Sequence, residues 1–253
     1  MSLHPPSPWI SVVIPIQDER ENIPLLASQL LKFFESRPES GSAPFELVFV
    51  DDGSSDGSGP LLDQLAVQSS AIRVIHLDRN HGQTAAFDAG FRQARGELVA
   101  TMDGDLQYDP TDFAKLLPFV DRYDLVCGLR QARHDNLVRR WSSRIANQVR
   151  NWAVHDGISD TGCSLKIFKK AVVKRLPPFK NMHRFFPALA KMYGFTVAEV
   201  PVQHFPRAHG TSKYGIGNRL FAGLYDLFAV RWMQKRCLNY TMKEVHPFEK
   251  PEL

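Results

Sequence analysis

Three groups of acidic residues each follow a run of apolar residues in the first half of the chain. They are Asp18 and Glu19 in PIQDEREN, Asp52 in VDDGSSDG, and Asp103 and Asp105 in MDGDLQ. If the apolar runs are strands of one parallel sheet, the three groups meet at its carboxyl edge, where such sheets bind ligands. An Asp-x-Asp pair there could share a divalent cation with a diphosphate, and Mg²⁺ and Mn²⁺ prefer such oxygen ligands.

Each acidic group taken alone also has a simpler explanation. Asp-Gly pairs are common in turns, so DDGSSDG by itself favours a loop. Three groups at successive strand ends are harder to explain in this way, because clustered carboxylates repel one another unless a cation is bound. The sequence therefore predicts a metal and nucleotide site at this edge.

The segments that carry these groups alternate between strand and helix patterns. The expected strands are Trp9–Pro15, Phe45–Val50, Ile72–Leu77, Leu98–Met102 and Asp124–Cys127, and the expected helices are Asn22–Phe34, Pro60–Val67 and Thr84–Ala94. This alternation predicts an α/β fold, a mostly parallel sheet flanked by helices on both faces.

The second half contains two amphipathic stretches, Val138–Trp152 and Ile216–Met233, and a further strand pattern at Gly194–Val202. The apolar stripe of the later stretch includes Leu227 and Phe228. Such stretches suit helices that lie on a membrane surface, although packing on the sheet must account for part of each. No apolar run reaches the ~20 residues of a membrane span, so none is expected.

Charge divides the chain in the same way. Residues 1–129 carry 9 Lys+Arg and 19 Asp+Glu, a balance of −10, whereas residues 130–253 carry 22 and 8, a balance of +14. A basic half can meet phosphate, nucleic acid or an anionic lipid surface. Its aromatic residues follow helical stripes rather than a stacking platform, so no nucleic acid partner is predicted. The three cysteines are widely spaced, which excludes a disulfide framework.

Seven segments together resemble family 2 inverting glycosyltransferases of the GT-A fold, and most closely the branch of dolichol-phosphate mannose synthase and polyprenyl-phosphate sugar transferases. They are PIQDEREN, VDDGSSDGS, RNHGQTAAFDAGFRQARGE, MDGDLQYDP, DTGCSLKIF, MHRFFPAL and PRAHGTSKYG. The resemblance runs from about Ser11 to about Arg236. It implies a Rossmann-like sheet and transfer of a sugar from a GDP- or UDP-sugar to dolichyl or undecaprenyl phosphate, with inversion at the anomeric carbon.

The resemblance also implies roles for matching residues. The donor nucleotide sugar would be bound by Pro15, Asp18, Glu19, Asp52, Asp103 and Gly104. The DxDxQ pattern would hold Mg²⁺ or Mn²⁺ through Asp103, Asp105 and Gln107. These three residues together with Arg207 and Lys213 form the expected catalytic set. Asp18 stands where the family motif usually has Asn.

The acceptor phosphate is expected to meet basic residues of the second half. The candidates are Arg139, Arg140, Arg144, Arg184, Arg207, Ser212 and Lys213, with His209 and Tyr214 in the same RAHGTSKY loop as Lys213. Each has a structural alternative: a turn with a surface lysine for Lys213, a solvated helix face for Arg139 and its neighbours, and a packed His183–Arg184 pair.

The acceptor decides the chemistry that the site needs. A phosphate monoester is already anionic and can attack if it is positioned. A hydroxyl acceptor would need a general base, and Asp160 is the candidate. Open alternatives are a transferase of the same fold with a soluble saccharide acceptor, and an inactive peripheral membrane adaptor. A nucleotidyltransferase would want a Gly-rich basic loop after the first strand, where this chain is acidic.

The expected organisation is one catalytic domain in two halves. Residues 1–129 would bind the nucleotide sugar and metal, residues 130–236 would bind the acceptor, and residues 237–253 would form a tail. The expected location is cytoplasmic, peripheral at the inner face of the membrane, where a membrane-spanning partner protein could assist.

Overall fold

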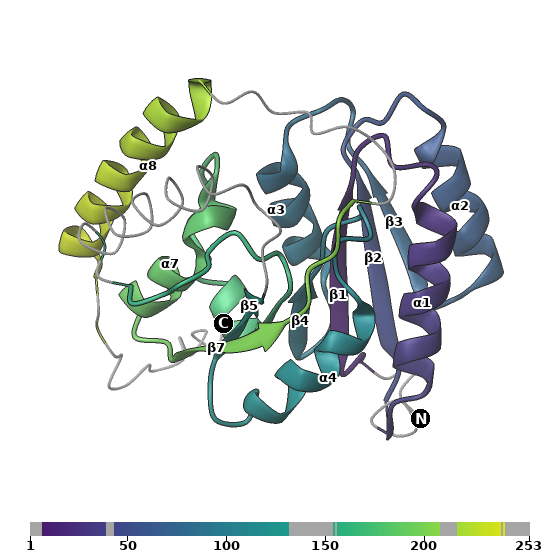
Figure 1. Cartoon of the computed structure of the whole chain (residues 1–253), viewed down its shortest axis with the longest axis horizontal. Coiled ribbons are helices and arrows are strands. Elements are labelled where there is room, and N and C mark those ends of the chain that lie inside the picture. Colours follow the sequence, from purple (N-terminus) through teal and green to yellow (C-terminus); the bar gives the residue numbers. More distant parts are fainter. Residues whose placement is uncertain are drawn as a thin grey trace, which may run out of the picture.

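A computed structural model describes residues 7–38, 43–131, 154, 156–207, 217–238 and 240 of the chain, with the backbone alone for 217–224. Its strands form one seven-stranded sheet in the order β3-β2-β1-β4-β6-β5-β7 (Figure 1). The strands are β1 Ile10–Ile16, β2 Phe45–Asp51, β3 Ile72–His76, β4 Leu98–Thr101, β5 Leu125–Arg130, β6 Lys166–Lys169 and β7 Val197–Val202.

Helices cover both faces of this sheet, as the alternating sequence pattern predicted. They are α1 Ile23–Glu35, α2 Ser58–Gln68, α3 Gln83–Gln93, α4 Phe113–Leu116, α6 Lys170–Val173, α7 Phe186–Met192 and α8 Gly217–Arg236. Short 3-10 turns are η2 Pro110–Asp112, η3 Leu117–Phe119 and η4 Met182–Phe185. The predicted strands and helices of the first half are all present, with bounds that shift by at most three residues, the largest shift being at the end of β5.

Strand β1 shows why the apolar runs become buried strands. Ile10, Val12, Ile14 and Ile16 pack on one face of the sheet, whereas Val13 packs on the other. Side chains alternate between faces along a strand, so a continuous apolar run can bury both faces. The parallel neighbours of β1 are β2 and β4, which places the ends of these three strands at one edge.

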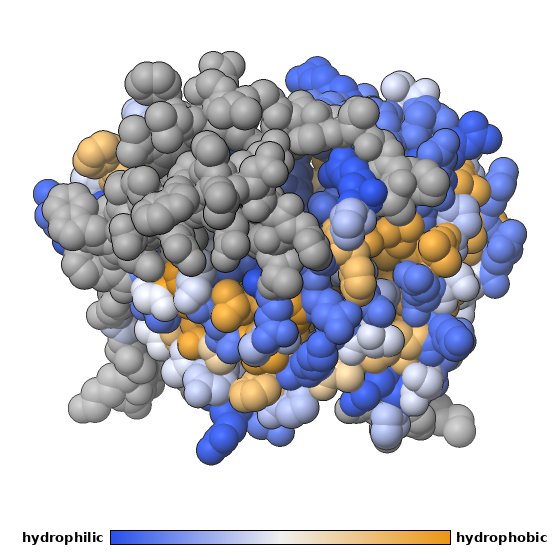
Figure 2. Space-filling model, in the orientation of Figure 1, coloured by the Kyte–Doolittle hydropathy of each residue, from blue (hydrophilic) through white to orange (hydrophobic). Residues whose placement is uncertain are grey.

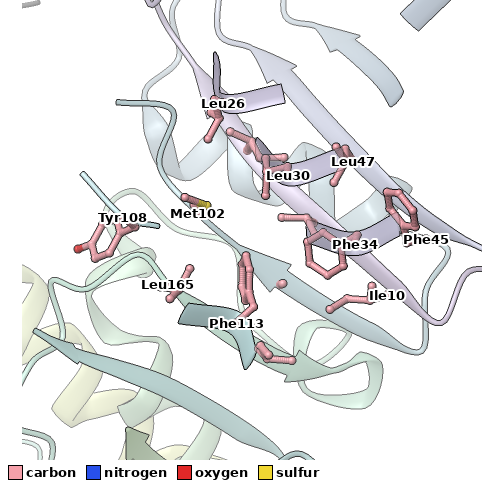
Figure 3. Packing of buried hydrophobic residues seen from close by; sticks show 14 of the residues in the cluster. Ile10, Leu26, Leu30, Phe34, Phe45, Leu47, Met102, Tyr108, Phe113 and Leu165 are labelled. Atoms are coloured by element: carbon pink, nitrogen blue, oxygen red, sulfur yellow. The ribbon is translucent and has the colours of Figure 1, made fainter. Parts of the chain in front are cut away.

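The core between α1 and the sheet is aromatic at its base (Figure 3). Phe34 of α1 lies 5.5 Å from Phe45 of β2 and 5.6 Å from Phe113 of α4, measured between ring centroids. Leu26 and Leu30 continue the same helix face and are fully buried. Burying each such side chain contributes about 1.5–3 kcal/mol, so this layer fixes the edge from which the acidic loops project.

Strand β6 was not predicted from the sequence. It runs antiparallel between β4 and β5, with Thr101 paired to Lys166. The strand has only four residues, KIFK, and a lysine stands at each end, so its sequence shows no clear strand pattern. The insertion brings Ser164 beside the third acidic loop, where Thr101 Oγ1 donates to its carbonyl over 2.6 Å and Asp103 N–H donates to its Oγ over 3.2 Å.

Helix α8 confirms the second amphipathic stretch but corrects its stripe. Leu227 and Val230 are buried, whereas Phe228 is 74% exposed, together with Tyr225 at 79% and Trp232 at 64%. Figure 1 shows this helix at the side of the molecule, away from β1–β3. The earlier stretch, Val138–Trp152, lies outside the described residues.

Among the helices that the structure describes, none is long and apolar enough to cross a membrane. On the face shown in Figure 2, hydrophobic and hydrophilic residues are interspersed over the described surface.

Candidate active site

The loop after β4 carries two acidic residues of the expected metal set, Asp103 and Asp105. Gly104 lies so close to β1 that an added Cβ would be 2.5 Å from Ile16 Cδ1 and 3.2 Å from the Pro15 carbonyl oxygen. Leu106 adopts a left-handed conformation with φ 60°, and the Gln107 N–H donates to Asp105 Oδ1 over 3.2 Å. This tight turn holds Asp103, Asp105 and Gln107 against the first strand.

The Asp103 carboxylate is in an environment that disfavours its charge. Burial, and next the charge of Asp105, raise the pKa of Asp103 to about 6. Gln83 of α3 donates to Asp103 Oδ1 over 2.7 Å. Two neighbouring acidic side chains with too little neutralising charge are the electrostatic setting that a bound cation relieves.

Arg207 supplies one positive charge to this loop from the segment that follows β7. Its Nη2 lies 2.8 Å from Asp105 Oδ2. The segment is held in place by backbone contacts, since the Phe205 N–H donates to the Gln107 carbonyl over 2.9 Å and Gln107 Nε2 donates to the Phe205 carbonyl over 3.3 Å. The structure thus brings together four members of the expected catalytic set, Asp103, Asp105, Gln107 and Arg207.

The acidic groups after β1 and β2 are joined to each other. Asp18, at φ 50°, donates its N–H to Ser54 Oγ over 3.0 Å and accepts the Ser55 N–H at Oδ1 over 2.7 Å. Glu19 Oε2 accepts from Asn22 Nδ2 over 2.6 Å. The Asp18 carboxylate therefore helps to shape the DDGSSDG loop, whereas the Glu19 carboxylate binds Asn22 at the start of α1.

Asp52 organises the approach to α3. Its two oxygens accept the backbone N–H groups of His81, over 2.7 Å, and Gly82, over 2.8 Å. The neighbouring Gly53 has φ 66°, and an added Cβ there would lie 2.3 Å from the Arg79 carbonyl carbon. Glycine is required by both the close approach and the left-handed backbone. Each carboxylate oxygen of Asp52 has a further lone pair, which could accept a hydrogen bond from a ribose or base.

A pocket of about 840 Å³ opens beside Asp103. The first half of the chain contributes Asn80, His81, Gly82, Gln83, Thr84, Phe87, Thr101 and Asp103, and the second half contributes Arg130, Thr161, Gly162, Cys163, Ser164, Lys166, Lys180, Asn181, His183, Arg184 and Phe186. Asp103 is the only carboxylate in this described lining, against four lysine or arginine side chains. The pocket therefore suits an anionic or strongly polar ligand.

Two of the cations in this lining are tied into the protein. Arg130 forms a bidentate pair with Asp160, Nε to Oδ2 and Nη2 to Oδ1, both over 2.7 Å. Asp160 also accepts the Gly162 N–H over 3.1 Å. Lys166, 3% exposed, donates to the Cys163 carbonyl. Asp160, considered from the sequence as a base, thus holds Arg130 in position with both oxygens.

The acceptor candidates divide between described and undescribed parts of the chain. Arg184 lines the pocket, whereas Arg207 lies on Asp105. The others lie outside the described residues; they are Arg139, Arg140, Arg144, Ser212 and Lys213, with His209 and Tyr214 of the same loop.

Several pocket residues were not predicted as site residues from the sequence. Arg130 ends β5, and Lys166 lies on the unpredicted strand β6. Gln83 and Thr84 open α3 within the RNHGQTAAFDAGF segment. The signal for Gln83 and Thr84 was their position, because the residues that begin the helix after a strand lie at the carboxyl edge.

The donor set suits a hard divalent cation. Two carboxylates and an amide oxygen from Gln107 resemble a Mg²⁺ or Mn²⁺ site that is completed by substrate phosphate. Within the described residues no cluster of three or more His, Cys, Asp or Glu side chains could hold a metal by itself.

Comparison with known proteins identifies the family. The sequence pattern of Glycosyl transferase family 2 matches residues 11–177. The chain is 37% identical over 221 residues to an undecaprenyl-phosphate 4-deoxy-4-formamido-L-arabinose transferase of Edwardsiella ictaluri, covering 87% of this chain and 66% of the relative. It is also 37% identical over 234 residues to a dodecaprenyl-phosphate galacturonate synthase of Rhizobium johnstonii, covering 89% and 67%. The chain spans about two thirds of the length of these curated relatives.

Solved structures confirm the fold. Glucosyl-3-phosphoglycerate synthase from Mycobacterium tuberculosis, in complex with Mn²⁺, UDP and phosphoglyceric acid, aligns with a TM-score of 0.60 and 17% identity over 89% of this chain and 78% of that one. The same enzyme in complex with Mg²⁺ and UDP gives the same four values.

Proposed function

The chain belongs to glycosyl transferase family 2, and from that premise we propose that it transfers a sugar from a GDP- or UDP-sugar to a polyprenyl phosphate, with inversion at the anomeric carbon. The relatives at 37% identity are described as transferring sugars to undecaprenyl phosphate or forming a dodecaprenyl-phosphate sugar. Polyprenyl phosphate is therefore the acceptor class that similarity favours.

One observation in the pocket carries this proposal. The described lining has four lysine or arginine side chains, of which Arg130 and Lys166 are tied to Asp160 and to the Cys163 carbonyl, whereas its one carboxylate, Asp103, belongs to the proposed metal set. Asp160 is held by Arg130 and is poorly placed to act as a free base. A phosphate acceptor is already anionic and needs cations and positioning rather than a base. A sugar hydroxyl acceptor needs a general base to remove its proton.

Each group then has a role in the reaction. An acceptor phosphate oxygen attacks the anomeric carbon, the bond from that carbon to the nucleoside diphosphate breaks, and inversion results. Asp103, Asp105 and Gln107 would hold Mg²⁺ or Mn²⁺, which neutralises charge on the leaving diphosphate. Pro15, Asp18, Glu19, Asp52 and Gly104 would border the nucleotide, and Arg184 and Arg207, with the basic residues outside the described part, would meet phosphate.

A membrane surface is the proposed place of the reaction. Tyr225, Phe228 and Trp232 recur at helical spacing on the exposed side of α8, and Lys235 and Arg236 follow them. Exposed aromatic residues beside basic ones are typical of helices that lie in a lipid headgroup layer. We therefore place the protein at the cytoplasmic face of a membrane, where a membrane-spanning partner could present the lipid.

The test measures nucleoside diphosphate release from a panel of UDP- and GDP-sugars with Mn²⁺ or Mg²⁺, with and without a short polyprenyl phosphate. Release that requires lipid, metal and Asp105, judged with Asp105→Ala, supports the proposal and identifies the donor. Release indifferent to lipid but raised by a free saccharide or a small phosphorylated acceptor would show a soluble-acceptor transferase instead. Absence of release from folded protein with every donor would favour an inactive adaptor.

A further inference from the structure

A chain of hydrogen bonds crosses the pocket wall from η4 to α3. The Asn181 backbone N–H donates to Thr84 Oγ1 over 3.1 Å, and Thr84 Oγ1 lies 2.6 Å from His183 Nδ1. Asn181 adopts φ 68°, and its side-chain Nδ2 donates to Asp226 of α8 over 2.9 Å. All three chain members, Asn181, Thr84 and His183, line the pocket beside Asp103.

This chain of hydrogen bonds engages one of the two imidazole nitrogens, Nδ1. Thr84 Oγ1 already accepts the Asn181 N–H, and within the described residues its hydroxyl proton has no acceptor other than His183 Nδ1. Thr84 is only half-buried and lines the pocket, so its oxygen can also accept a proton from Nδ1 while its own proton turns into the pocket. With either tautomer Nδ1 is engaged by Thr84, and Nε2 is the nitrogen of the neutral ring that is left to hydrogen-bond a ligand.

The imidazole is also kept neutral. Burial, and next the charges of Arg184 and Lys166, lower the pKa of His183 to about 3. The Phe87 ring packs against it with 6.3 Å between ring centroids. A neutral ring held at Nδ1 gives the pocket a hydrogen-bonding group, Nε2, whose charge does not change around pH 7.

We infer that His183 is a specificity-determining residue whose Nε2 hydrogen-bonds a hydroxyl group of the transferred sugar, with Thr84 as the positioning residue that holds the ring at Nδ1. The inference rests on the proposed function. Gln83, adjacent to Thr84, donates to Asp103 Oδ1, so this chain of hydrogen bonds lies next to the proposed metal loop. The sugar is bonded directly to the diphosphate that this loop would hold, and Asp103 of the loop and His183 line the same pocket.

The experiment compares binding of nucleotides with and without a sugar. Isothermal titration with Mn²⁺ would measure UDP and GDP against UDP-glucose, UDP-galacturonate and GDP-mannose. His183→Phe keeps an aromatic ring but removes both ring nitrogens. Thr84→Val keeps the side-chain shape but removes the hydroxyl, and Thr84→Ser keeps the hydroxyl. For the sugar nucleotide that binds best, we expect His183→Phe and Thr84→Val to raise Kd roughly tenfold and leave the Kd of its parent nucleotide unchanged, while Thr84→Ser stays close to wild type.

Four outcomes would overturn the inference. In the variants, the Kd values of nucleotide and sugar nucleotide could rise equally, or neither could rise. The wild type could bind both ligands with equal Kd, or the variants could raise only the KM for lipid phosphate. The last would assign His183 to the acceptor instead. Turnover separates this inference from the proposed function, because lipid-dependent release by the wild type can stand while the binding result fails. If the variants selectively lose sugar binding but the wild type shows no lipid-dependent release, the inference about His183 stands and the proposed function fails.

Discussion

The Nη2 atom of Arg207 lies 2.8 Å from Asp105 Oδ2, although the two residues are 102 positions apart in the sequence. The Arg207 guanidinium is therefore paired with a carboxylate oxygen of Asp105 that would bind the metal at the proposed site. A bound cation and Arg207 would compete for this carboxylate, and a displaced Arg207 would be free to bind phosphate.

We predict that Arg207→Met increases the affinity for Mn²⁺ in the absence of nucleotide by about tenfold, because a charge-assisted hydrogen bond no longer competes for Asp105. Turnover should fall at the same time, since the phosphate contact is lost. Electron paramagnetic resonance of free Mn²⁺ measures the binding. Arg207→Lys is the control and should stay near wild type, whereas unchanged or weaker Mn²⁺ binding by Arg207→Met would exclude the competition.

Asp103→Asn should separate stability from activity. Because burial and Asp105 raise the pKa of Asp103 to about 6, its ionised form costs folding free energy, so the free energy of unfolding falls as pH rises from about 4 to about 6. At pH 7.5 without metal, the variant should melt above wild type, while its release activity falls roughly 10²-fold or more. Differential scanning calorimetry and the release assay check this. The exposed Asp121→Asn should change neither, and a lower melting temperature for Asp103→Asn would contradict the argument.

Glu46 should stabilise the opposite edge of the sheet. Burial raises its pKa, but hydrogen bonds from Ser11, the Arg95 N–H and the guanidinium groups of Arg73 and Arg95 outweigh burial and leave the pKa below its usual 4.5. Glu46→Gln should therefore cost about 2–3 kcal/mol at pH 7.

The pH dependence of that loss has a definite sign. A lowered folded-state pKa gives stability that is fully present above the unfolded pKa and is lost as pH falls through the folded one. The difference between wild type and Glu46→Gln in urea unfolding should be constant above about pH 5.5 and shrink below 4.5. The exposed Glu97→Gln is the matched control. A difference that grows towards low pH would refute the assignment.

The exposed face of α8 gives a prediction about membranes. Changing Tyr225, Phe228 and Trp232 together to Ser should reduce co-sedimentation with anionic vesicles roughly fivefold or more, because their apolar area no longer enters the headgroup layer. Release from a water-soluble acceptor analogue should be unaffected. Val67→Ser, at an apolar residue 90% exposed on α2, is the control. Equal vesicle binding by the triple variant and wild type would remove α8 from the proposed membrane surface.

The sequence by itself determined the frame of the sheet and the edge at which chemistry is placed. Strand β1 has apolar residues on both faces, and α1 repeats them at helical spacing, so local periodicity was enough to predict both. The acidic loops after β1, β2 and β4 followed from the same argument, because parallel strands end at one edge. The roles of Asp103, Asp105 and Gln107 remain predictions.

Only the tertiary structure decided how the second half completes this edge. It inserts β6 between β4 and β5, ties Asp160 to Arg130, places Arg207 on Asp105 and turns Phe228 outward. None of these features leaves a local pattern: β6 is four residues long, and the ion pairs join residues 30 and 102 positions apart. Periodicity reports which face of an element is buried, whereas partners distant in the chain are selected by packing and charge after the elements have assembled.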